Sequence, residues 1–424
     1  MDHTHDGFFG CSERSFGQRF ADALTEFLTG GKARKELRAH DAIDADTFDE
    51  RYGTWRREAE NARTRGADPN VAAQAAAPVI AATPPPSGPD PHPWNTTTKR
   101  VPLGKMWVIP STAETVDLGQ FDPRRPPIVT IDSGDVIVYK NTWTHFLNRL
   151  QPGMPIAALA EMRSGLAGRG VHSIIGPIAV NGAKPGDLLE IRFLHMRTID
   201  FGANFHNASE LRTGVLPDEF ADGHIHYFDL NSDDGYVAFS PQIKLELQPF
   251  QGTFGVAARG DKAVSSITPG QHAGNIDVKE MIAGTSLFVP VWHDGGLLFT
   301  GDSHALQGDG EVNITAIETA MEEVRCQVIL HPAAGYTWPM IETATHWLML
   351  GTDPSLNEAL RIALRNTIGF LTAKVGMSRD EAYSLASIGV DFRVSQMVDV
   401  NNGIHAMIPK LIFAPDFRST ISIA

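Results

Sequence analysis

Residues 176–194 read GPIAVNGAKPGDLLEIRFL, in which two apolar runs flank a segment of turn-forming residues. The runs GPIAV and LLEIRFL are rich in branched apolar side chains, which favour strands at this length. The segment between them contains Pro-Gly and Gly-Asp, which are typical turn sequences. The stretch therefore predicts two strands separated by a turn.

The same alternation of short apolar runs and turns extends from Val101 to about residue 330. PPIVTI and VIVYKN flank SGD, and TSLFVPVW, GGLLFTG, EVNITAIETA and EVRCQVIL continue the series. Such runs, recurring roughly every ten residues, indicate a β-rich body. We expect an α+β fold whose strand-rich body is a sandwich or a barrel.

A helical section follows near the C-terminus. Asp353 and Pro354 are residue types that begin helices, and an apolar stripe with helical spacing continues toward Gly376. The stripe comprises Leu356, Leu360, Leu364, Ile368 and Leu371. Ser378 and Glu381 have the spacing of a capping box for a second helix. We therefore expect a helical hairpin, followed by a last strand over GVDFRVSQMVDV.

The first 98 residues differ from the rest in composition. Residues 1–65 are rich in charge and helix formers, and apolar residues at helical spacing between Phe16 and Leu28 predict a helical N-terminal extension. Residues 66–98 are rich in alanine and proline, which cannot build a core of their own. This segment is expected to be a linker or an arm beside the main body, residues 99–424.

Charge and cysteine content narrow the class of partner and the cellular location. With 50 acidic and 36 basic residues the chain carries a net charge of −14, which argues against nucleic acid or an anionic membrane as a partner. Of the two cysteines, Cys326 lies in the apolar run EVRCQVIL, so no disulfide framework is expected. Neither a signal-peptide pattern nor about 18 consecutive apolar residues occur. We expect a cytoplasmic protein that acts on a small molecule.

A polar cluster lies within residues 300–312, TGDSHALQGDGEV. Asp302 and His304 are two residues apart, so in an extended segment both side chains point the same way and can share one ion. The alternative is a polar turn between two strands, because Asp and His are common in turns and usually form local hydrogen bonds there.

Two neighbouring segments carry further candidate ligands. GQHAGNIDVKE places Asn275 and Asp277 two residues apart, and Glu318 lies in the otherwise apolar ITAIETA. A buried carboxylate is costly unless it meets a cation or takes up a proton, so Glu318 is a candidate metal ligand or general base. On a half-exposed strand Glu318 would instead face solvent.

The remaining histidines are less distinctive. His172 precedes a turn shaped by glycine and proline, from which it could reach a pocket. His224 and His226 have the spacing of a metal-binding pair, but an exposed strand face explains them equally well. We expect six others to be structural: His145, His195, His206, His331, His346 and His405.

The usual motifs of covalent catalysis and phosphate binding are missing from the sequence. It contains no G-x-S-x-G elbow, no phosphate-binding loop and no dinucleotide fingerprint. Any chemistry is therefore expected to use a water activated by a divalent metal, with a nearby carboxylate that transfers protons.

From Val101 to the end, the order of motifs resembles the acetamidase/formamidase family. The matching pieces are SGDVIVY, HSIIGPIAVNGAKPGDLLEI, PFQGTFGVAARG, AGNIDVKEMIAGTSLFVPVWHDGG, GDSHALQGDGEVNITAIE and EAYSLASIGVDFRVSQMVD. The resemblance implies that residues 99–424 form a metal-dependent catalytic domain. It also implies hydrolysis of short amides such as formamide or acetamide to ammonia and a carboxylate. We further expect a homo-oligomer.

The resemblance also assigns candidate roles. The expected catalytic residues are Asp302, His304, Gln307, Glu311 and Glu318. The expected ligands of a divalent metal are Asn275, Asp277, Asp302, His304 and Glu318. His304 favours zinc, whereas the oxygen ligands suit calcium. Substrate contacts are expected from His172, Gly308 and Asp309. Two alternatives stay open: a lactam, carbamate or bulkier amide as substrate, and a non-catalytic β protein stabilised by calcium.

Overall fold

The computed structural model describes residues 82–83, 101–166, 168–207, 211–232 and 234–424. The helices expected over residues 1–65 lie outside these ranges, as does the 66–98 segment apart from β1 (Ala82–Thr83). The compact unit that carries the site comprises the described residues up to Val237 and Glu246–Ala424. Where these two ranges meet in the sequence, β11 (Tyr236–Ser240) and β12 (Ile243–Glu246) form a two-stranded sheet of their own.

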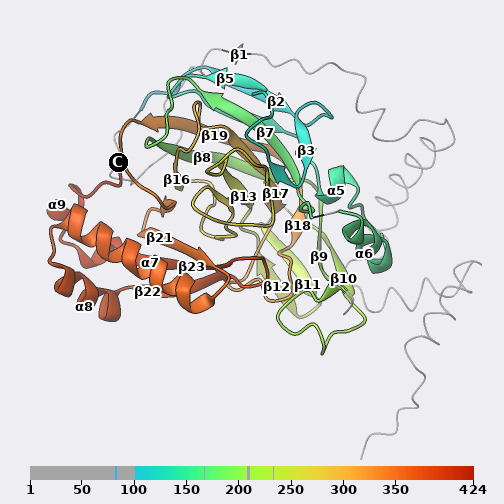
Figure 1. Cartoon of the computed structure of the whole chain (residues 1–424). Coiled ribbons are helices and arrows are strands. Elements are labelled where there is room, and N and C mark those ends of the chain that lie inside the picture. The colour runs from blue at the N-terminus through green and yellow to red at the C-terminus, as the bar shows by residue number, and fades with distance from the viewer. Residues whose placement is uncertain (1–81, 84–100, 167, 208–210, 233) are drawn as a thin grey trace, which may run out of the picture. The chain divides into compact units, whose positions relative to one another are not determined.

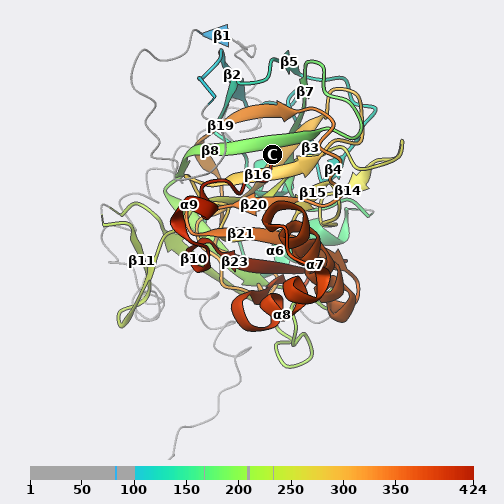
Figure 2. The same cartoon turned by 90° about the vertical axis from the view of Figure 1, so that its left-hand side faces the viewer.

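The larger sheet has ten strands in the order β1-β2-β6-β19-β8-β16-β20-β21-β23-β22. Figure 2 shows most of them in succession, from β2 through β19, β8 and β16 to β23. Their bounds are β2 (Met106–Pro110), β6 (Val136–Lys140), β8 (Leu188–Thr198), β16 (Ser286–Pro290), β19 (Met321–His331), β20 (Met340–Glu342), β21 (His346–Asp353), β22 (Asp391–Gln396) and β23 (Asn402–Pro409). The long antiparallel pair β8 and β19 forms the middle of this sheet.

The second sheet has nine strands, and its strand β17 carries Asp302 and His304 of the polar cluster. Its main path is β10-β9-β18-β17-β13-β15, and β7 joins it beside β17 with β3 and β5 as its other partners. The bounds are β3 (Val116–Leu118), β5 (Val129–Ile131), β7 (Ser173–Val180), β9 (Phe201–His206), β10 (His224–Asp229), β13 (Phe250–Val256), β15 (Ala273–Asn275), β17 (Leu298–His304) and β18 (Glu318–Thr319). A separate pair is formed by β4 (Gln120–Phe121) and β14 (Val264–Ser265).

The strands predicted over residues 176–194 are present, but they do not pair with each other. GPIAV belongs to β7 in the nine-stranded sheet, and LLEIRFL opens β8 in the ten-stranded sheet. The turn 181–187 therefore carries the chain from one sheet to the other. Both strands are almost wholly buried, which explains why they are apolar runs rather than alternating ones.

One continuous hydrophobic core joins the two sheets. Side chains such as Ile137, Ile191 and Val324 of the larger sheet pack in the same cluster as Phe254 and Leu298 of the smaller one, and all are buried. Burial stabilises the fold by about 1.5–3 kcal/mol for each large apolar side chain. The strand-rich, sandwich-like prediction is confirmed, whereas the barrel alternative is not, because both sheets are open.

The helical hairpin near the C-terminus is also confirmed (Figure 1). It consists of α7 (Leu356–Phe370), a π-helical turn (Leu371–Val375) that ends at Gly376, and α8 (Arg379–Gly389). Ser378 and Glu381 form the predicted capping box. The expected start at Asp353 is wrong by two residues. Asp353 ends β21, and its carboxylate accepts a hydrogen bond from the backbone N of Ser355, which is the N-cap.

The buried face of α7 differs from the expected leucine stripe. Ala359 and Ala363 are buried, whereas Leu360 is exposed. The helix lies so close to β21 that a Cβ on Gly351 would come within 2.3 Å of the carbonyl oxygen of Ala359. Only small side chains fit at this contact. Of the predicted stripe, Ile368 and Leu371 are buried, and Leu356 and Leu364 pack partly buried against the core.

Short helices complete the described part of the chain. These are α5 (His145–Asn148), α6 (Ile156–Ser164), a 3-10 turn (Lys410–Ile412) and α9 (Pro415–Arg418). None of the described helices combines the length and the apolarity that crossing a membrane requires.

Candidate functional site

The polar cluster lies at the end of β17, where Asp302 and His304 meet as predicted. His304 Nε2 is 3.2 Å from Asp302 Oδ1. The backbone is not extended at this point, however, because Asp302 has a φ of 58°. Asp277 and Glu311, which lie nearby, also have positive φ values of 46°. Such backbone strain costs about 1–3 kcal/mol for each residue and is concentrated at functional sites.

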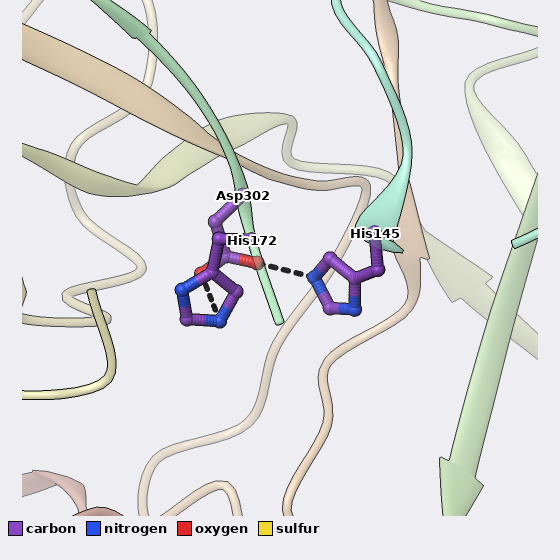
Figure 3. A group of neighbouring side chains, drawn as sticks. All are labelled: His145, His172 and Asp302. Carbon is purple, nitrogen blue, oxygen red and sulfur yellow. Dashed lines mark hydrogen bonds and ion pairs between the residues drawn. The ribbon is translucent and has the colours of Figure 1, made fainter. Parts of the chain in front are cut away.

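Three histidines surround the Asp302 carboxylate. His145 Nε2 lies 2.9 Å from Asp302 Oδ1, and His172 Nε2 lies 3.7 Å from Asp302 Oδ2 (Figure 3). The second carboxylate is Glu318, whose Oε2 lies 3.2 Å from His145 Nε2 and 3.3 Å from His304 Nε2. All of these side chains are buried, so Glu318 does not face solvent. Three imidazole nitrogens and two carboxylates thus converge on one point.

His145 had been expected to be structural, and the structure instead places it in this cluster. It lies just after β6, in α5, and is 157 positions away from Asp302 along the chain. No other candidate ligand stands near it in the sequence, so no spacing could indicate its role. The remaining histidines that were expected to be structural do not line the site.

Hydrogen bonds fix the orientation of two of the imidazoles. Gln307 Oε1 accepts a hydrogen bond from His304 Nδ1 at 3.0 Å, because the Gln307 Nε2 donates to the backbone oxygens of Asp277 and Ser395. His172 Nδ1 lies 2.9 Å from Ser266 Oγ. In both rings Nδ1 is occupied and Nε2 points to the carboxylates, an arrangement typical of metal-binding histidines. Gln307 therefore holds His304 and does not itself line the cavity.

The charges within the cluster depend on one another. Burial disfavours a charged His145, but Glu318 and Asp302 outweigh it and raise the pKa of His145 to about 9. The same two carboxylates raise the pKa of His304 well above its usual value, again against burial. His172 has no such hydrogen-bonded pair of carboxylates, and burial lowers its pKa to about 4. A divalent cation between the imidazoles and carboxylates would take the place of the two protons.

Three more carboxylates form the other side of the site. Single oxygens of Asp277, Glu311 and Asp399 lie within 4.8 Å of one another. Burial raises the pKa of all three, and that of Asp399 reaches about 7. Sequence reasoning missed Asp399, because it lies in the loop after β22 with no ligand-like neighbour.

Asn275 holds Asp399 through its side-chain amide. Its Nδ2 donates to Asp399 Oδ2 at 2.8 Å, and its Oδ1 accepts a hydrogen bond from Thr253 Oγ1. Both ends of the amide are engaged within the site, so Asn275 positions Asp399, and its predicted ligand role stays a prediction.

The cavity is small and strongly polar. Its charged lining consists of the five carboxylates, the three histidines and Arg163, while Val171, Phe205, Ile267 and Ile314 contribute apolar walls. The space open to water is about 30 Å³, which is enough for two or three water-sized groups at about 10–15 Å³ each. Gly308 and Asp309, predicted to contact substrate, do not line it, and Asp309 Oδ2 pairs with Lys279 Nζ at 3.0 Å.

The residues present fit a divalent cation. Both oxygens of Asp277 are buried without a hydrogen-bond partner among the described residues, and the buried Oε2 atom of Glu318 faces the imidazoles of His145 and His304. Gly252 on β13 lies directly beneath them. A Cβ at this position would come within 2.4 Å of His304 Cε1, 2.5 Å of Asp277 Oδ1 and 2.9 Å of Asp302 Oδ2. The missing side chain leaves the room in which these three groups converge.

The strand expected over EVNITAIETA is mostly a loop. Only Glu318 and Thr319 form a strand, and Glu311 and Ile314 have positive φ values. The loop brings Glu311 into the cavity, and the following strand then presents Glu318 to the histidines.

Comparison with known proteins agrees with this fold. The profile of the Acetamidase/Formamidase family matches residues 162–261 and 257–415. A formamidase of Methylophilus methylotrophus is 26% identical over 321 residues, which cover 58% of this chain and 78% of the relative. The crystal structure of an acetamidase from Bacillus halodurans superposes with a TM-score of 0.65 at 29% identity, covering 72% of this chain and 98% of that one. An acetamidase structure from Yersinia enterocolitica gives a TM-score of 0.66 at 28% identity, with coverages of 74% and 94%.

Proposed function

Because the chain belongs to the acetamidase/formamidase family, we propose that it hydrolyses short aliphatic amides through a metal-activated water. It is an amidase, a hydrolase of linear amide C–N bonds. The substrates proposed are of the formamide and acetamide type, and the products are ammonia and a carboxylate. The observation that carries the proposal is the convergence of His145, His172, His304, Asp302 and Glu318 on one small buried cavity.

Zinc is the proposed metal. The Nε2 atoms of the three histidines and a carboxylate oxygen of Asp302 would hold it, since three nitrogens and one oxygen suit zinc. An ion bound there supplies a water of lowered pKa and polarises the amide carbonyl. The predicted ligand Asp277 lies within 4.8 Å of Asp302 and His304 and is proposed to stay at the edge of this shell.

Glu318 is proposed to take the proton from the attacking water. Its Oε1 is fixed by the backbone N of Ala316 at 2.9 Å, which leaves Oε2 pointing toward His145 and His304. In the cluster without an ion, burial disfavours the charge of Glu318, yet these two imidazoles lower its pKa. A cation held by the same imidazoles would also favour the ionised carboxylate, which is the form that accepts a proton. The same carboxyl group then protonates the leaving nitrogen.

The size of the cavity supports a short acyl group. Formamide and acetamide have only three or four non-hydrogen atoms, in keeping with about 30 Å³ of open space beside the ligands. Phe205 and Ile314 provide the apolar wall against which an acyl carbon would lie.

The test measures ammonia release from formamide, acetamide, propionamide and urea, and ring opening of a lactam to its amino acid, with bound metals determined on the same sample. Activity toward the short amides should be lost on chelation and restored by zinc. Equal rates in protein stripped of metal, with its fold retained, would refute metal dependence. Hydrolysis of only the lactam or only propionamide would instead refute the proposed substrate class.

Two variants separate the ligand role from the base role. Glu318→Gln should keep its metal and lose about 10²–10⁴ in turnover, whereas Asp302→Asn should lose the metal itself. Glu322→Gln is the matched control, because that carboxylate pairs with Arg197 on a partly exposed face. Assembly into a homo-oligomer and a cytoplasmic location stay predictions from the sequence.

A further inference from the structure

The cavity has two halves with different chemistry. One half presents the imidazoles of His145, His172 and His304. The other half presents only carboxylates, from Asp277, Glu311 and Asp399. A zinc ion held by the histidines satisfies the first half, whereas the second half has only Arg163 as a lysine or arginine in the cavity lining.

Few hydrogen-bond donors reach the carboxylates of the second half. Both oxygens of Asp277 lack a partner among the described residues, although only 1% of this residue is exposed. Asp399 receives one hydrogen bond, on Oδ2, from Asn275. Arg163 is the one lysine or arginine in the cavity lining, and it forms no ion pair with any carboxylate in the described part of the chain. Buried carboxylates this close together are costly without a cation.

The geometry of the carboxylates suits a second ion. Ligands on opposite sides of a cation are separated by twice the bond length, which is about 4.6–5.2 Å for calcium and about 4.0–4.2 Å for magnesium. The three carboxylates present one oxygen each within 4.8 Å of the others. An all-oxygen ligand set favours magnesium, manganese or calcium over zinc.

The two halves adjoin one another. Asp277 also lies within 4.8 Å of Asp302 and His304, and Glu311 lies within 4.8 Å of His304 and Glu318. Two ions in these halves would therefore be neighbours that share ligands, as in enzymes with ion pairs about 3.5–4 Å apart.

We propose that the site is binuclear, with a hard divalent cation held by Asp277, Glu311 and Asp399 beside the ion held by the histidines. This proposal rests on the proposed function for its first ion. The second ion neutralises the carboxylate half, and Asn275 positions Asp399 toward it through the Nδ2 hydrogen bond.

A second acidic cluster supplies a discriminating control. Glu280, Asp309 and His405 also lie within 4.8 Å of one another. There, Arg393 pairs with Glu280 at 3.3 Å and Lys279 pairs with Asp309 at 3.0 Å, so both carboxylates already have cations. We expect this cluster to stay free of metal.

The experiment loads the full chain, freed of metal, with Mn²⁺ alone and records metal content and electron paramagnetic resonance. Wild-type protein should hold two ions per chain and give the multiline spectrum of an exchange-coupled pair. Asp399→Asn and Glu311→Gln should each hold one ion and give a six-line spectrum of isolated Mn²⁺. Glu280→Gln should behave as wild type, and circular dichroism should confirm the fold of each variant.

Three results would overturn the binuclear proposal. These are one ion per chain with an uncoupled spectrum in wild type, two coupled ions retained in both Asp399→Asn and Glu311→Gln, and loss of the second ion in Glu280→Gln. Ammonia release is followed separately. If the protein holds one ion per chain and is fully active as an amidase, the binuclear proposal is refuted and the proposed function stands. If it holds two coupled ions and hydrolyses no amide, the proposed function is refuted and the binuclear proposal stands.

Discussion

Replacing Gly252 by alanine tests whether the space beneath the cluster is essential. The added Cβ would lie 2.4 Å from His304 Cε1 and 2.5 Å from Asp277 Oδ1, whereas ordinary contacts begin at 3.4 Å. The two groups would therefore have to move by about 1.0 and 0.9 Å, respectively. Because metal–ligand distances tolerate only about 0.2 Å, His304 would leave a shared ion.

The expected result for Gly252→Ala is a fall in kcat/KM of about 100-fold or more, since misplacement by about 1 Å costs roughly this factor. Metal affinity should fall in parallel. Ammonia release and titration with zinc measure the two effects. The matched control is Gly369→Ala, because an added Cβ there meets nothing within 4 Å. A fully active Gly252→Ala protein with unchanged zinc affinity would refute the arrangement of ligands described above.

Three further predictions follow from individual contacts. Gln307→Leu removes the acceptor of His304 Nδ1 and should weaken zinc binding by about 10–100-fold, as measured by competition with a chelator; unchanged affinity would exclude the orienting role. Gly369→Ala should raise the free energy of unfolding in urea by about 0.5–1 kcal/mol, because this exposed glycine lies inside α7. Burial opposes the charge of Glu190, but His331 and Arg192 lower the pKa of this group below 4.5 in the folded chain. Its ionised form therefore stabilises the fold above that pH, and this stability is lost as pH falls through the folded pKa. Glu190→Gln should make the free energy of unfolding less dependent on pH below about 4.5; an unchanged dependence would contradict the assignment.

Features that depend on neighbouring residues can be predicted from the sequence, whereas the meeting of distant segments cannot. The capping box at Ser378 and the strands around residues 176–194 depend on neighbouring residues, and both predictions are confirmed. The segment EVNITAIETA has the composition of a strand, yet most of it is a loop, because tertiary contacts bring Glu311 into the cavity.

The residues of the site fall into the same two groups, those that a local motif indicates and those that no local motif indicates. Asp302, His304, Asp277 and Glu318 stand in recognisable segments, and the structure brings them together. His145 and Asp399 stand alone in their segments and reach the cavity only through the packing of distant strands. Nothing in their local sequence distinguishes them from structural residues.

The wide separation of these side chains along the chain also sets the order of events during synthesis. His145 emerges 157 residues before Asp302, and Asp399 follows 97 residues after Asp302. The complete cavity can form only after the chain through Asp399 has left the ribosome and both sheets have met. Loading of the proposed ions would therefore follow the assembly of both sheets. Which metal bound would then depend on the free ions that the folded chain encounters, as well as on the preference of its ligands.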